Sequence, residues 1–93
     1  MIFSFEELID IECQELASFL KRKNRAYGNS VGDPVMCFSK LSAAERIAVR
    51  MDDKISRIVR GGEYPGDDDK KDLLGYLILE RVIARWGKEE DAS

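Results

Sequence analysis

Two Ser-x-x-Glu sequences constrain the fold of this chain more than any other feature, because each predicts where a helix begins. Ser4 with Glu7, and Ser42 with Glu45, match the capping box, in which each of the two side chains accepts a hydrogen bond from the other residue's backbone N–H. Each pair stands before a run of apolar residues with helical spacing. The sequence therefore predicts two helices with defined starting points.

Glycines mark the ends of both helices, and an acidic run marks the start of a third. Gly28 follows the first apolar run, and the Gly61-Gly62 pair follows the second. Asp67 begins a run of aspartates that suits the positive end of a helix dipole, and helical periodicity continues from there to Trp86. We predict an all-α fold, with a compact three-helix core and a long loop after the first helix. We expect Val35, Met36 and Phe38 to hold that loop on the core.

Composition and charge narrow the class of protein. With 93 residues, the chain has room for one domain, which we place at residues 1–87, with residues 88–93 as a flexible tail. No apolar run approaches the roughly 20 residues that cross a bilayer, and the first residues are acidic where a signal peptide is basic. The two cysteines lack metal-ligand spacing. We expect a cytoplasmic protein without membrane contact.

Histidine is absent, which excludes several kinds of chemistry. Ser-His-Asp and Cys-His mechanisms and imidazole-containing zinc sites all need it. The net charge of −3 argues against a general attraction to nucleic acid or anionic lipid. Any chemistry must use carboxylates, Lys, Arg, Tyr or Asn, and the sequence does not identify a catalytic residue.

Two carboxylate pairs have the spacing of a metal site. Glu12 with Glu15, and Asp69 with Asp72, each present two carboxylates on one side of a helix. Mg²⁺ shared between antiparallel helices is bound in this way, so we take these four residues as candidate metal ligands. A solvated helix surface is the alternative. Glu12 favours the metal site, since it shares the apolar stripe of the first helix and needs a partner there.

The end of the first helix is a candidate nucleotide site. Lys23, Asn24 and Tyr27 share the predicted core-facing side and lead into a glycine loop that contains Asn29. The alternative is that this basic segment only caps the negative end of the helix.

A basic face runs along the second helix. We call its four arginines the arginine face, and they are Arg46, Arg50, Arg57 and Arg60. In one interpretation Asp53 pairs with Arg50 or Arg57 and the surface compensates itself. In the other, Lys54 and Arg57 bind phosphate and Asp53 belongs to the same site.

The third helix is apolar almost all round, which predicts self-association. Leu73, Leu77 and Ala84 form the predicted core side. The opposite side should then be an interface in a dimer or larger homo-oligomer, and it consists of Gly75, Leu79, Val82 and Trp86.

Four motifs resemble a known family. They are KxxNxxYGNS from Lys21 to Ser30, the Phe38-Ser39-Lys40 loop, RMDDKISRIVRG ending at Gly61, and DLLGYLIL ending at Leu79. Their order and spacing are similar to the nucleotide-modification-associated domain family of small phage-borne proteins, over residues 18–85. The resemblance implies an all-helical domain from a phage or prophage setting, close to nucleotide and DNA-base modification, without implying a particular reaction.

A more distant resemblance is to MazG-like all-α nucleoside triphosphate pyrophosphatases, which hold Mg²⁺ over a triphosphate with an ExxE helix and an ExxD helix. Glu12 to Glu15 is similar to the first motif and Asp69 to Asp72 to the second, although the second motif here is DxxD. The interval and helix order of that family are not clearly reproduced. This resemblance implies Mg²⁺ as a cofactor if the protein is hydrolytic.

We therefore expect a small nucleotide-handling protein that binds a nucleotide or another phosphorylated small molecule, with hydrolysis of a nucleoside triphosphate left open. The end of the first helix would hold the base or sugar, and Lys54 and Arg57 the phosphate. The alternative is a non-enzymatic phage interaction module, which would dock a host or phage protein through its arginine face and third helix.

Overall fold

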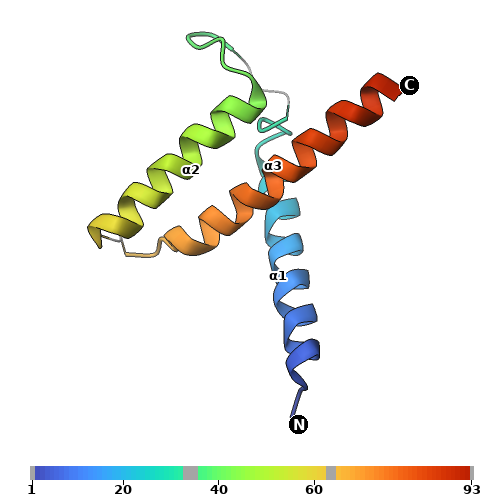
Figure 1. The fold of residues 1–93 in the computed structure, drawn as a ribbon, viewed down its shortest axis with the longest axis vertical. Helices are drawn as coiled ribbons and strands as arrows, with labels where there is room; N and C mark the ends of the chain where they lie inside the picture. The colour runs from blue at the N-terminus through green and yellow to red at the C-terminus, as the bar shows by residue number, and fades with distance from the viewer. Residues whose placement is uncertain (1, 33–35, 63–64, 93) are drawn as a thin grey trace. The chain divides into compact units, whose positions relative to one another are not determined.

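The fold class is all-α, as predicted. The structure, a computed structural model, describes residues 2–32, 36–62 and 65–92, and within these ranges it contains three helices and no strand (Figure 1). The chain divides into two units, residues 1–30 and 31–93, and each is described separately below.

The first unit is built on helix α1 (Phe5–Ala26). The predicted capping box is present. The backbone N–H of Glu7 donates to Ser4 Oγ at 3.1 Å, and the N–H of Ser4 donates to Glu7 Oε1 at 3.1 Å. Tyr27 is the C-cap, and Gly28 follows it with φ of 60°, a left-handed conformation that suits glycine. Both predicted ends of this helix are confirmed.

The second unit begins with a turn and a loop that lead to helix α2 (Ala43–Arg60). Ser42 and Glu45 form the second capping box, with N–H to oxygen distances of 3.2 and 3.3 Å. Gly61 ends the helix with φ of 73°. The predicted ends of this helix are therefore also confirmed.

Helix α3 (Asp69–Ala92) is longer than the sequence predicts. Its first turn is closed by Asp68, whose Oδ1 accepts a hydrogen bond from the N–H of Lys71 at 3.0 Å. At the other end the helix continues beyond Trp86 into the segment predicted as a tail. A glycine inside a helix costs only about 1 kcal/mol, and the Lys and Glu residues that follow Gly87 are good helix formers.

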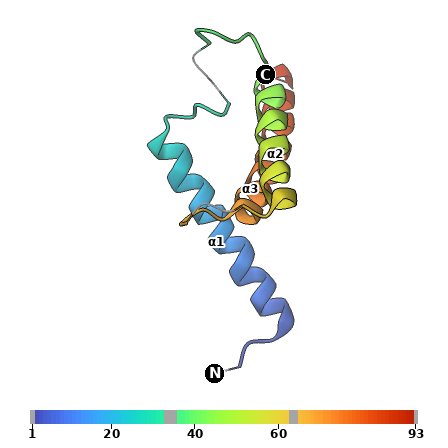
Figure 2. The same cartoon turned by 90° about the vertical axis from the view of Figure 1, so that its left-hand side faces the viewer.

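α2 and α3 pack against each other as an antiparallel helical hairpin (Figures 1 and 2). On α2, Ile47 is only 2% exposed. The positions of α3 that are buried or half-buried recur at alternating spacings of three and four, which brings them to one side of the helix. They are Asp69, Asp72, Tyr76, Leu79 and Ile83, and the half-buried Leu73 and the buried Gly75 lie on either side of this row.

This packing differs in part from the predicted faces of α3. Leu77 is 44% exposed although we expected it in the core, whereas Gly75 is buried and Leu79 half-buried although we expected them in an interface. Val82 and Trp86 of that predicted interface are exposed, at 48% and 40%. The turn at Gly32 lies against the ring of Trp86. The difference has a physical reason. Asp69 and Asp72 form ion pairs with cations of α2, and these pairs fix the rotation of α3 about its own axis.

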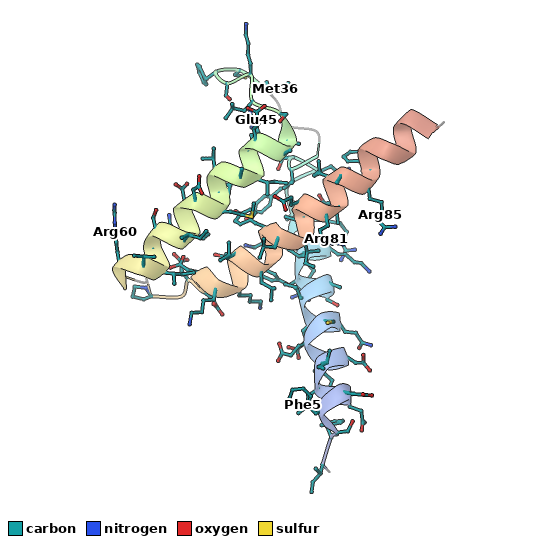
Figure 3. All side chains as sticks on the ribbon, viewed as in Figure 1. Phe5, Met36, Glu45, Arg60, Arg81 and Arg85 are labelled. Atoms are coloured by element: carbon teal, nitrogen blue, oxygen red, sulfur yellow. The ribbon has the colours of Figure 1, made fainter. Side chains whose placement is uncertain are left out.

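The loop before α2 also differs from expectation. We expected Val35, Met36 and Phe38 to hold it on the core. Val35 lies outside the described residues, while Met36 and Phe38 have exposed side chains (Figure 3). In the described part of the chain, no helix is both long and apolar enough to cross a membrane.

Candidate functional site

The hairpin joins two sets of residues that the sequence analysis treated separately. Lys54 Nζ lies 3.1 Å from Asp72 Oδ2 and 3.5 Å from Asp69 Oδ1. Arg57 Nη1 lies 3.7 Å from Asp69 Oδ1. The predicted phosphate ligands of α2 therefore face the predicted metal ligands of α3. We call Lys54, Arg57, Asp69 and Asp72 the charged cluster.

The charged cluster is largely withdrawn from solvent. The side chain of Asp69 is 4% exposed, that of Lys54 14% and that of Asp72 21%. Arg57 is the accessible member, with 50% of its side chain exposed. Charges in such a setting interact more strongly than on an open surface, and each would be costly to leave without its partner.

The environment shifts the pKa of Lys54. Burial lowers this pKa, but the hydrogen bond and negative charge of Asp72, together with the charge of Asp69, outweigh burial and the repulsion from Arg57. The net result is a pKa raised above the ordinary value. Lys54 is therefore held firmly in its cationic form.

A cleft opens beside the cluster, where α2 ends and α3 begins. Its volume is about 270 Å³, and it is lined by Arg57, Ile58, Gly61, Asp68, Asp69 and Lys70. Cations and carboxylates thus border the same small space. Sequence reasoning did not single out Asp68 and Lys70, and their only signal was adjacency to the Asp69 to Asp72 pair.

The predicted nucleotide residues of α1 form the closure of the helix. Asn24 Nδ2 donates to Asn29 Oδ1 at 2.6 Å, and the N–H of Asn29 donates to the carbonyl of Asn24 at 3.2 Å. The second bond, with Gly28 in a left-handed conformation, is the pattern of a Schellman cap. Tyr27 is 63% exposed, and Lys23 Nζ lies 4.7 Å from the centre of the Phe19 ring. The capping alternative accounts for these contacts.

The acidic pair of α1 lies on an exposed helix. Glu12 and Glu15 are both exposed, and so are Phe5 and Ile9 of the same apolar stripe, so the partner that we inferred for Glu12 stays a prediction. Over the described residues, no group of three or more Asp, Glu, Cys or His side chains is placed to hold a metal ion. Asp69 and Asp72 remain a two-carboxylate set. Mg²⁺ fits such a set, because it is often bound by one or two carboxylates together with substrate phosphates and water.

The arginine face is less self-compensated than one interpretation required. Asp53 is exposed and makes no ion pair with Arg50 or Arg57 among the described residues. The carboxylates that pair with α2 come from α3, which sequence spacing along α2 alone could not reveal. Arg50 and Arg60 are exposed (Figure 3 shows Arg60 at the end of α2).

Comparison with known protein families, with curated proteins and with solved structures found no match to this chain.

Proposed function

We propose that the protein handles nucleotides, and that the charged cluster with its adjoining cleft binds the phosphates. One observation carries the proposal. Two cations and two carboxylates are joined by three ion-pair contacts of 3.1, 3.5 and 3.7 Å beside a cleft. Cations for phosphate and carboxylates for Mg²⁺ are the donor set that a Mg²⁺–nucleotide complex requires.

The chemistry of binding would be an exchange of partners. Arg57, half-exposed at the cleft, is the cation best placed to reach a phosphate oxygen first, and its planar guanidinium can donate two hydrogen bonds. Lys54 could then turn from Asp72 to the phosphate. Asp69 and Asp72 would hold Mg²⁺, whose role when bound is to offset phosphate charge and, in a hydrolytic protein, to activate water.

A thermal-shift panel of nucleoside and deoxynucleoside triphosphates, each with and without Mg²⁺, tests this proposal. Binding to the native state should raise the melting temperature by mass action. Arg57→Ala should weaken binding about tenfold, which corresponds to losing about 1.4 kcal/mol. Arg60→Ala is the matched control, because Arg60 is on the same turn of α2 but outside the cluster.

The two variants separate a cluster site from general attraction to arginines. Equal loss of binding in Arg57→Ala and Arg60→Ala would contradict the proposal, and so would a melting temperature that no triphosphate changes. Asp72→Asn should abolish the part of the shift that depends on Mg²⁺. Release of pyrophosphate in the same panel decides whether binding leads to hydrolysis.

The end of α1 enters the proposal as a separate prediction. If Asn24 and Tyr27 form a nucleotide-binding segment of their own, Asn24→Ala should weaken nucleotide binding more than it lowers the free energy of unfolding. Loss of stability alone would assign this segment to helix capping.

A second candidate function is docking of an acidic protein partner on the arginine face. The observation that favours it is the exposure of Arg50 and Arg60, neither of which makes an ion pair with the described residues. A fluorescent poly-glutamate peptide should bind in a salt-dependent way, and Arg50→Glu with Arg60→Glu should abolish that binding. Arg57→Ala should affect nucleotide binding in the first proposal and peptide binding only weakly in this one.

A further inference from the structure

One broad side of the hairpin presents apolar side chains to solvent. We call these residues the hairpin apolar face. They are the exposed residues Ala48, Ile55 and Val59 of α2 and Leu77 and Ala84 of α3, with the half-buried Leu73 of α3. Ile55 is 48% exposed, Val59 78% and Leu77 44%. Exposed apolar residues from two neighbouring helices form a patch of the kind that marks an interaction surface.

Helix geometry places the two halves of this face on the same side. Lys54 marks the side of α2 that meets α3, and Ile55 lies about 100° further round the helix. On α3, Tyr76 lies on the side that meets α2, and Leu77 again follows by about 100°. In an antiparallel pair of helices, the same angular step along each chain, counted from the side that faces the other helix, leads to the same broad side of the pair.

The outer edges of this side carry opposite charges. Beyond the apolar residues, α2 has the acidic residues Glu45 and Asp52, whereas α3 has the basic residues Lys70 and Arg81. All four side chains are exposed, and Figure 3 shows Arg81 projecting from α3 away from α2. The surface between these edges is mainly apolar and is interrupted on α3 by the exposed Glu80. The acidic edge of α2 and the basic edge of α3 are complementary when this side meets its own copy.

We infer that a second copy of this chain covers the hairpin apolar face, forming a four-helix bundle from two hairpins. A two-fold axis parallel to the helices would lay α2 of each copy on the partner's α3, in antiparallel contact. This is the up-and-down arrangement in which short-loop helical hairpins pack, with one surface patch meeting its own copy.

The register within the hairpin brings the charged edges together. The ion pair of Lys54 with Asp72 places these two residues at the same level along the common direction of the helix axes, which we call their height. Glu45 is nine positions before Lys54 (54 − 45), and Arg81 is nine positions after Asp72 (81 − 72), so these two also share a height. The two-fold axis keeps heights unchanged, and Glu45 therefore meets the partner subunit's Arg81. Each dimer contains this pair twice.

This inference does not depend on the proposed nucleotide site. Arg57 lies about 60° round α2 from Lys54 in the direction opposite to Ile55, on the other broad side of the hairpin. The dimer leaves it accessible. Failure of nucleotide binding would leave the dimer standing, and a monomeric protein would leave the nucleotide site standing.

Light scattering and sedimentation of the full chain, from micromolar to several hundred micromolar, test the inference. A mass of twice 10.6 kDa is expected. Ile55→Arg should give a monomer, because it places a charge without a partner in the interface. Asp53→Arg is the control, since Asp53 is exposed about 160° round the same helix from Ile55, and this variant should remain dimeric. Monomer mass at every concentration would overturn the inference, and so would equal effects of the two variants.

A mixing experiment tests the charge register separately. Glu45→Lys and Arg81→Glu should each weaken self-association about tenfold, because two attractive pairs become repulsive. An equal mixture of the two variants should dimerise normally, since each position 45 then meets an opposite charge at position 81 of the other chain. Because Glu45 also belongs to the capping box with Ser42, Arg81→Glu, which leaves that cap intact, is the decisive single variant. Circular dichroism establishes that both variants remain helical. Absence of recovery in the mixture would contradict the two-fold arrangement.

Discussion

Lys54 and Asp72 join the two helices of the hairpin through a contact of 3.1 Å between Nζ and Oδ2. The pair lies between residues that sequence analysis assigned to different kinds of site, a phosphate site on α2 and a metal site on α3. In the structure the same two residues set the rotation of α3 against α2. This rotation decides which apolar residues of α3 are covered by α2 and which face solvent.

Removing the buried charge of Asp69 should destabilise the hairpin. Its side chain is 4% exposed and faces both Lys54 and Arg57. Asp69→Asn should lower the free energy of unfolding by about 2 kcal/mol. This loss is smaller than the full cost of breaking a buried ion pair, because Lys54 still pairs with Asp72 in the variant. Urea denaturation measures this change. Asp67→Asn, at an exposed position two residues earlier, should stay within about 0.5 kcal/mol of the unsubstituted protein.

The raised pKa of Lys54 predicts a loss of stability in alkali. A lysine whose pKa is higher in the folded than in the unfolded state stabilises the fold fully below its unfolded pKa. That contribution disappears as pH rises through the folded pKa, which here lies above the ordinary 10.5. Denaturant midpoints measured from pH 8 upwards should therefore fall in this alkaline range. Lys54→Arg should remove much of the fall, because arginine stays charged. An identical alkaline profile in both proteins would contradict the assignment to Lys54.

The contact of Gly32 with Trp86 predicts a position that does not tolerate a side chain. A methyl group at Gly32 would collide with the indole ring, so Gly32→Ala should cost about 1 to 3 kcal/mol and displace the ring. Trp86 is the only tryptophan, and its fluorescence therefore reports the displacement directly. Gly62→Ala is the control, because a methyl group there meets nothing within 4 Å. Unchanged emission in Gly32→Ala would show that the turn does not hold this ring in solution.

The second capping box should contribute measurably to stability. Ser42 Oγ accepts the N–H of Glu45 at 3.2 Å, and its loss leaves a helix N–H without that acceptor. Ser42→Ala should lower the melting temperature, corresponding to about 1 kcal/mol. Ser56→Ala, an exposed serine within the same helix, should be neutral or slightly stabilising because alanine is the better helix former. A similar loss in both variants would show that the cap is not the cause.

The sequence by itself determined the helices and most of their ends. Ser4 with Glu7, Ser42 with Glu45, and Gly61 act through hydrogen bonds and backbone conformation within one or two turns, so their effect does not need the rest of the fold. The same locality explains the end of α1, where a cap was one of two interpretations that the sequence left open.

Only the tertiary structure decided how α3 is turned and which charges meet. α3 has apolar residues on almost every side, so periodicity could not distinguish its covered face from its exposed one. The choice came from Asp69 and Asp72 meeting Lys54, a contact between residues at least 15 positions apart (69 − 54). Burying charges is favourable only when they are paired, and pairing across helices depends on the register of both. That register is a property of the packed hairpin and is not encoded in either helix alone.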